Sequence, residues 1–152
     1  MTVEVRLGMH AAMRAAAVDL LTDFAQDAGI NLQIYEGRPK SIYPPCAFVD
    51  SISETVTYTG LRARVVAADI VVIHGLFDSK ETATQKDAFV DAFMDWVTDN
   101  PHVNVNDAIG LVTSTVDDPN YVPDWMPPEG QRSYYATHIA YEGHTQGRGV
   151  MV

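Results

Sequence analysis

The stretch that decides the fold is residues 46–77, CAFVDSISETVTYTGLRARVVAADIVVIHGLF. Gly60 divides it into two long runs rich in β-branched residues, Cys46–Thr59 and Leu61–Phe77. Such residues favour strands, and a short Thr-Gly turn between two strands favours a hairpin. We therefore expect one long antiparallel β-hairpin in the middle of the chain.

Pairing the two strands about the Thr59–Gly60 turn predicts the character of the hairpin tip. Thr57 then faces Arg62, and Thr55 faces Arg64, so one side of the tip is polar. A hairpin with a buried base and a polar tip is expected to project into solvent or onto another subunit. We therefore take these four residues as a candidate subunit interface.

The base of the hairpin is expected to be apolar on both faces, because Val49 meets Ile70 in the same register. This register also sets Asp50 against Asp69. Like charges directly opposite each other on a sheet are unfavourable. We therefore expect a β-bulge, a shifted register or an additional partner at Asp50.

Two segments with helical spacing flank the hairpin. Apolar residues recur three or four positions apart from about Val5 to Ala28, and Gly29 supplies a C-terminal stop. A second helix is expected from Ser79, a candidate N-cap, to about Thr98.

Three further strands are expected, at Leu32–Tyr35, Ile109–Val116 and Ser133–Glu142. The order of elements predicts the α+β class, with a mostly antiparallel sheet, a long projecting β-hairpin and two main flanking helices. The length of 152 residues fits a single domain. We expect that domain over residues 1–143, with a proline-rich loop at 117–130, and a flexible C-terminal tail at 144–152.

The chain is acidic, with 20 Asp and Glu against 10 Lys and Arg and a formal net charge of −10. This charge opposes tight binding of nucleic acid, although DNA can pass such a surface without sticking. Arg14 and Asp19 interrupt the alanine-rich N-terminal stretch, so no secretory signal is expected, and apolar runs stop far short of the roughly 20 residues that cross a bilayer. A soluble protein made in the cytoplasm is expected.

The residue chemistry favours a structural role over an enzymatic one. His138 and His144 could join Asp117 or Asp118 around a metal, but histidines at such positions more often face solvent or one polar partner. The lone cysteine, Cys46, follows two prolines at a strand start, where a thiol usually packs as a small core residue. We predict no catalytic residue, no metal and no cofactor.

The loop at 117–130 holds four prolines and a second set of candidate contact residues. Tyr121, Trp125 and Met126 are of the types enriched at protein interfaces. Two interpretations remain open: the loop contacts another protein, or it folds back onto its own core.

The order and spacing of these elements carry a family resemblance. The residues concerned are the alanine-rich helix Met9–Ala28, a strand ending in Tyr35-Glu36-Gly37, the phrase IYPPCAFV at 42–49, the long hairpin, a helix with FVDAF at 89–93 and a closing strand YATHIAY at 135–141. Over roughly residues 7–143 the chain resembles the tail terminator, or tail-completion, proteins of long-tailed bacteriophages. The proline-aromatic loop and the glycine-rich tail are longer than the family pattern.

This resemblance implies a structural virion protein at the head-proximal end of the tail, made in the host cytoplasm. The family forms a ring, expected to be a hexamer, that caps the tail tube, terminates its polymerisation and offers the head–tail joining surface. The partners implied are copies of the chain, the tail tube protein and the head connector, with DNA passing through the ring without specific binding. In that setting Tyr121, Trp125 and Met126 become a head–tail contact loop. Another neck or connector component, and a small metal-dependent enzyme, are the alternatives.

Overall fold

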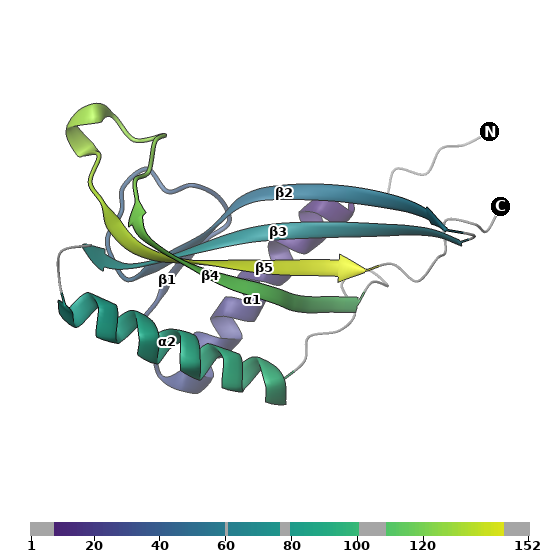
Figure 1. The fold of residues 1–152 in the computed structure, drawn as a ribbon, viewed down its shortest axis with the longest axis horizontal. Helices are drawn as coiled ribbons and strands as arrows, with labels where there is room; N and C mark the ends of the chain where they lie inside the picture. Colours follow the sequence, from purple (N-terminus) through teal and green to yellow (C-terminus); the bar gives the residue numbers. More distant parts are fainter. Residues whose placement is uncertain (1–7, 60, 77–79, 101–108, 145–152) are drawn as a thin grey trace.

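The structure is a computed structural model that describes residues 8–59, 61–76, 80–100 and 109–144. Its elements, in chain order, are α1 (Met9–Ala28), β1 (Gln33–Tyr35), β2 (Cys46–Thr59), β3 (Leu61–Leu76), α2 (Lys80–Asp99), β4 (Ile109–Tyr121), the 3₁₀-helix η1 (Pro128–Gly130) and β5 (Tyr134–His144). The fold is α+β, as predicted: two helices pack on a five-stranded, mostly antiparallel sheet (Figure 1). Ser79 and residues 145–152, which the sequence analysis used for a helix cap and a tail, lie outside the described residues.

The strands lie in the order β1-β2-β3-β5-β4. Only the short β1 runs parallel to its neighbour, and the other three pairings are antiparallel. The last strand of the chain, β5, therefore lies inside the sheet between β3 and β4, and β4 forms an edge. This order brings side chains from three strands distant in sequence onto one face.

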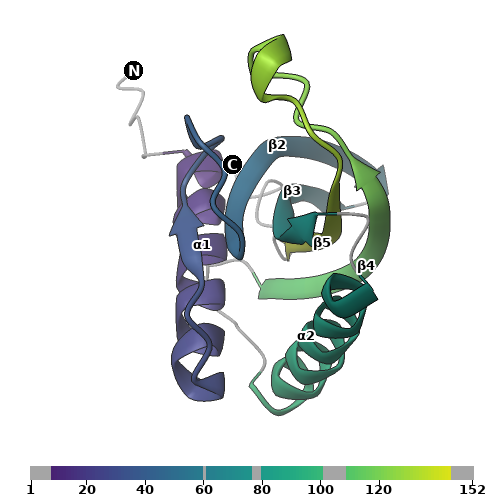
Figure 2. The same cartoon turned by 90° about the vertical axis from the view of Figure 1, so that its left-hand side faces the viewer.

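The main core lies between the helices and one face of the sheet, and an aromatic cluster joins the two helices within it. The Phe24 ring packs edge-on against Phe89 and Phe93, with ring centroids 5.3 and 5.2 Å apart. The helices converge at their C-terminal ends (Figure 2), where the Trp96 indole donates a 2.8 Å hydrogen bond to Asp27. The regularly spaced apolar side chains of both helices thus pack against each other and against the sheet.

Two glycines allow the helices to approach the sheet closely. A Cβ atom at Gly75 of β3 would lie 2.9 Å from Oγ1 of Thr82 in the first turns of α2. A Cβ atom at Gly143 of β5 would lie 2.6 Å from the sulfur of the buried Met13 in α1. A larger residue at Gly75 would clash with a short branched side chain, whereas at Gly143 it would require two flexible methionine side chains to move.

The base of the hairpin has the predicted register, and of the three explanations left open for Asp50, namely a bulge, a shifted register or an additional partner, a bulge is present. Val49 pairs with Ile70, whereas the next pair along the hairpin joins Ser51 to Asp69, so Asp50 is an extra residue in β2. Its carboxylate accepts a 2.7 Å hydrogen bond from the side chain of Arg38. The bulge thus separates the carboxylates of Asp50 and Asp69 in the ladder and gives one of them a cationic partner.

The bulge also makes the predicted tip register wrong by one residue. Thr57 pairs with Ala63 instead of Arg62, and Thr55 pairs with Val65. Because paired residues share a face of the sheet, Thr55 does not share the face of Arg64. The prediction assumed that one register holds from the turn to the base. The extra residue at Asp50 instead shifts the pairing of the outer half by one residue relative to the base.

Two element boundaries also differ from those predicted. Strand β4 continues through residues 117–121, which were expected to begin the proline-rich loop, so the loop proper follows Tyr121. The strand accommodates Pro119 at a register irregularity between Asp118 and Tyr121, on the edge of the sheet where proline is tolerated. At the other end β5 extends to His144, one residue into the predicted tail.

Candidate functional site

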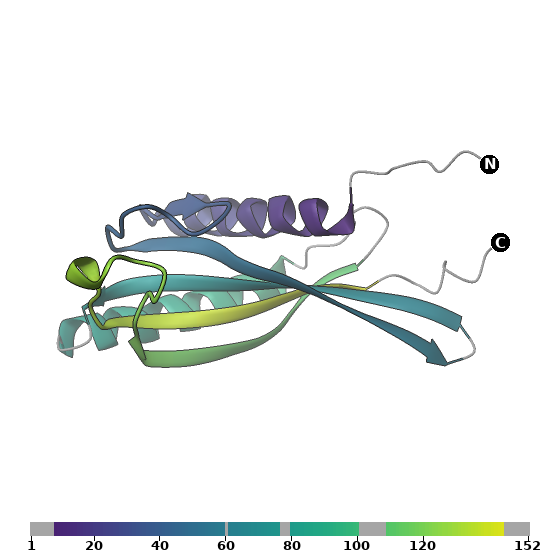
Figure 3. The same ribbon diagram turned by 90° about the horizontal axis from the view of Figure 1, so that it is seen from above.

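The most prominent surface feature is the outer part of the hairpin, here called the arm, which comprises residues 54–59 and 61–65. Among the described residues, β5 last pairs with β3 at Val65, and β1 pairs with β2 only as far as Phe48, so in this part of the chain the arm beyond Val65 is a two-stranded ribbon. It extends beyond α1, β4 and β5 (Figure 3). Isolated two-stranded ribbons are marginally stable in water, so an arm of this length gains from contact with a further surface.

An ionic network fixes the root of the arm. Arg64 donates a 2.6 Å hydrogen bond to Glu54 on the opposite strand, and the same carboxylate lies 3.2 Å from Nε2 of His10 in α1. The bond from Arg64 is the largest cause of the lowered pKa of Glu54. Of the four candidate interface residues, Arg64 thus has an ion-pair partner within its own chain, and Thr55 is exposed. The side chains of Thr57 and Arg62 lie outside the described part.

Acidic residues form a stripe along the exposed face of each helix. The spacing of four residues places them one above another: Asp19, Asp23 and Asp27 on α1, and Asp87, Asp91, Asp95 and Asp99 on α2. Like charges at this spacing oppose helix formation by a few tenths of a kcal/mol per pair. The helix layer therefore presents a strongly acidic outer surface.

The proline-aromatic loop folds back onto the sheet face that the helices leave uncovered. The ring of Trp125 packs edge-on against the buried Phe48, with centroids 5.9 Å apart, and the Arg38 guanidinium lies 6.0 Å from its centre. Tyr121 packs against the same small core. Two of the three residues proposed for a head–tail contact thus serve the protein's own packing, while Met126 is half-buried and Val122 is exposed.

Behind this loop, His138 of β5 sits between carboxylates from the two neighbouring strands. Its Nδ1 lies 3.6 Å from Asp69 of β3, and its Nε2 lies 3.3 Å from Asp118 of β4. The interaction with the Asp69 carboxylate is the largest cause of the raised pKa of His138, and burial opposes it. Tyr121 stacks edge-on against the imidazole at 5.6 Å.

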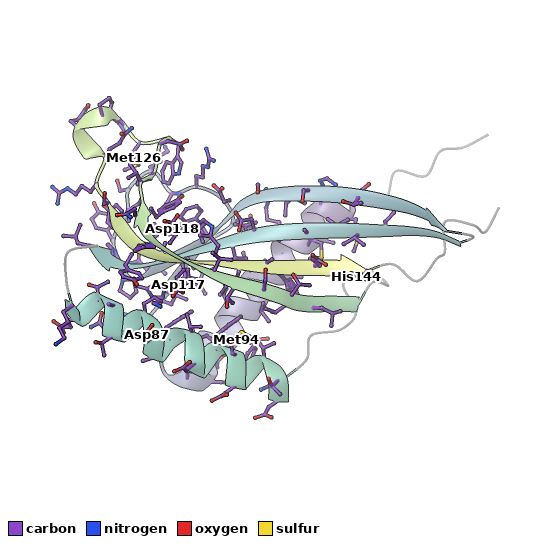
Figure 4. The ribbon with its side chains drawn as sticks, viewed as in Figure 1. Asp87, Met94, Asp117, Asp118, Met126 and His144 are labelled. Atoms are coloured by element: carbon purple, nitrogen blue, oxygen red, sulfur yellow. The ribbon has the colours of Figure 1, made fainter. Side chains whose placement is uncertain are left out.

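The residues weighed for a metal site do not converge. His144 lies at the far end of β5 from Asp118 (Figure 4) and bonds Glu142 at 2.8 Å. Asp117 turns to the helix side, where it accepts a hydrogen bond from the buried Lys86. Within the described ranges no three His, Cys, Asp or Glu side chains are arranged to hold a metal ion.

Lys86 and Cys46 are two buried groups whose chemistry could suggest reactivity. Burial lowers the pKa of Lys86, but hydrogen bonds to Asp117 and Asp87 outweigh it and raise the pKa to about 12. Burial raises the pKa of the Cys46 thiol to about 11. Both groups are thus held in their unreactive protonated forms at neutral pH.

The chain matches no known protein-family profile, and it matches no curated protein. Among the described residues, no helix is both long and apolar enough to cross a membrane. His138 and Asp118 were considered together only as candidate metal ligands, and Asp69 only as the residue opposite Asp50, so the triad of these three residues was not predicted. An aspartate within the apolar run of β3 was the available signal, and it could be used only once the strand order was known.

Proposed function

We propose that this chain is a structural virion protein that assembles into a ring, expected to be a hexamer, at the head-proximal end of a phage tail. There it would cap the tail tube, terminate its polymerisation and provide the surface for head joining. The observation that carries the proposal is the arm: a two-stranded ribbon of this length, extending past the helices, is best explained by a neighbour that it docks against. The family resemblance over residues 7–143 supplies the identity of the assembly.

The acidic helix layer supports self-association as the purpose of the arm. The arm carries Arg62 and Arg64, and the helix stripes place seven exposed aspartates on the same chain. Attraction between opposite charges on different faces favours a head-to-tail contact, and a head-to-tail contact closes into a ring when its rotation permits. One copy would thus lay its arm along the helices of the next.

Native mass spectrometry and electron microscopy of the purified protein test this proposal. We expect rings with a central hole, and we expect Arg62→Glu combined with Arg64→Glu to shift the population to folded monomers. Lys40→Glu combined with Lys80→Glu is the matched control, because it changes the net charge equally at exposed sites away from the arm. Intact rings in the arm variant would count against the arm as the interface.

A binding assay separates the tail terminator from the other neck components. A tail terminator should bind the end of assembled tail tube and stop its elongation, whereas another connector should bind the head portal without affecting tube length. A chain that stays monomeric at high concentration and in the presence of tube protein would exclude both functions.

A further inference from the structure

A second feature, unrelated to the arm, is a cavity of about 400 Å³ on the helix side of the sheet. Ile30 and Pro45 line one wall, and Gln85, Ala88 and Phe89 of α2 line the other, with His74 of β3 between them. Pockets that bind small organic groups begin at about 300 Å³, and an apolar cavity of about 150 Å³ already holds benzene. The volume thus suffices for one substituted aromatic ring.

His74 gives this cavity a specific polar group. The residue is only 8% exposed, and its Nε2 shares a 2.9 Å hydrogen bond with Oγ1 of the fully buried Thr137. The other ring nitrogen, Nδ1, makes no hydrogen bond within the described ranges. Among the described residues, the fully buried side-chain atoms without a partner do not include this nitrogen, so solvent or a ligand in the cavity can reach it and form a hydrogen bond.

The chemistry of the lining restricts that ligand to a neutral molecule. The six lining residues include no carboxylate, lysine or arginine. Burial and the nearby charge of Lys86 lower the pKa of His74 to about 4, so the ring is neutral at physiological pH. A charged ligand would find no counter-ion among these lining residues, and the nearby Lys86 is already paired with Asp117 and Asp87, which disfavours phosphates, carboxylates and amines.

A neutral imidazole has one donor and one acceptor, and Thr137 can satisfy either, so Nδ1 can play either role. A phenolic hydroxyl both donates and accepts and therefore matches both tautomers. The ring of Phe89, whose centroid is 5.2 Å from that of His74, offers an aromatic wall. We propose that the cavity beside His74 binds one neutral phenolic ring, with its hydroxyl on Nδ1 and its ring against Phe89.

Titration of the full-length, isotope-labelled protein with p-cresol tests this site by nuclear magnetic resonance. We expect saturable shifts of the Ala88 and Phe89 signals and none at Val116 on the opposite face. Toluene, which lacks only the hydroxyl, should bind roughly tenfold more weakly, the factor that one hydrogen bond provides. Equal affinity for the two probes, or shifts that do not saturate, would overturn the proposal.

Two variants sharpen the test. His74→Phe should reduce the affinity for p-cresol to that for toluene. Ala88 is the exposed residue at the mouth of the cavity, so Ala88→Leu should weaken the binding of both probes. The comparison of probes on the unmodified protein stands even if His74→Phe fails to fold. Unchanged p-cresol affinity in Ala88→Leu would place the probe elsewhere and refute the site.

The phenol can be a free small molecule or a tyrosine side chain of a bound protein, and one further measurement distinguishes them. Saturating p-cresol should release a partner that inserts a tyrosine, and it should leave every assembly intact if the natural ligand is free. Because p-cresol binding is measured on the chain alone, failure of the ring proposal would not affect this result.

Discussion

The Nε2 atom of His138 lies 3.3 Å from a carboxylate oxygen of Asp118 on the adjacent strand, and its Nδ1 lies 3.6 Å from Asp69 on the other side. Protonation of this single side chain therefore adds a cation between two acids at the centre of the sheet.

This arrangement predicts a pH-dependent contribution to stability. Because the interaction with the Asp69 carboxylate raises the pKa of His138 in the folded state, the stabilisation by His138 is full below the ordinary value of 6.5 and is lost as the pH rises through the raised pKa. Since both acids are partly exposed, we expect His138→Gln to lower the free energy of unfolding at pH 5.5 by up to about 1 kcal/mol. Urea unfolding at pH 5.5 and 8.5 measures this; an equal loss at both values would contradict it.

His74 should act with the opposite sign. Burial lowers its pKa to about 4, so the unfolded chain binds a proton that the folded chain excludes between pH 6.5 and about 4. The free energy of unfolding of the native protein should therefore decrease as the pH is lowered from 6.5 to about 4. In His74→Phe the free energy of unfolding should decrease less over the same pH range, whatever the overall stability of the variant. An unchanged pH dependence in this variant would refute the lowered pKa of His74.

Lys86 and Asp117 form an asymmetric pair, because the lysine side chain is 6% exposed and the aspartate 48%. In Lys86→Met the aspartate can be hydrated, so we expect a loss below about 1 kcal/mol. In Asp117→Ala a buried ammonium keeps only Asp87, so we expect a loss of about 1–3 kcal/mol. Denaturant unfolding of both single variants and the double variant gives the coupling, and the reverse order of losses would contradict this account.

Gly75→Ala tests the close contact between β3 and α2. The new Cβ would lie 2.9 Å from the branched side chain of Thr82, which cannot move away easily, so we expect a loss of about 1–3 kcal/mol. Gly37→Ala is the matched control, because its nearest neighbour would lie 3.9 Å away. Similar thermal midpoints for the two variants would show that α2 can shift without cost.

Trp125→Ala tests whether the loop is anchored to its own sheet. The variant exposes the small core around Phe48, and because Trp125 is only half-buried we expect a loss of about 2–3 kcal/mol. Met126→Ala should cost less than about 1 kcal/mol. If Trp125→Ala left stability unchanged while head joining failed, the indole would belong to the contact surface instead.

The Cys46 thiol should be unreactive in the folded protein. It is fully buried, and burial raises its pKa to about 11, so little thiolate is present at pH 8 and a reagent cannot reach it. Modification by a coloured disulfide reagent should follow the unfolding rate and become fast in urea. Rapid modification in native buffer would show that the start of β2 opens readily.

Local patterns predicted the elements and much of the hairpin. Apolar spacing predicted the helices to within a few residues, and the opposition of Asp50 and Asp69 predicted an irregularity at Asp50, for which a bulge was one of three explanations. The predicted pairing at the hairpin tip was wrong by one residue because of this bulge, since the sequence does not reveal which residue is left unpaired in the ladder. The sequence also predicted that the strand from Ile109 would end at Val116, whereas β4 continues to Tyr121. Pro119 indicates a strand end unless the strand is known to lie at the edge of the sheet.

The polar clusters were beyond local patterns. His138 meets Asp69 and Asp118 only because β5 inserts between β3 and β4, an order that depends on how the whole sheet assembles. The cavity beside His74 likewise joins the end of α1, the start of β2 and the middle of α2. Residue types suggested candidates, but tertiary contacts decided which of them meet.

The long ladder between β2 and β3 has a consequence for how such a protein can diverge. One residue added to each strand at facing positions beyond Asp50 leaves the Val49–Ile70 pairing untouched, because the pairs nearer the base keep their partners. Each such paired insertion lengthens the ribbon by about 3.4 Å and turns its outer end over. Homologues can therefore vary their reach and the side they present without repacking their interiors.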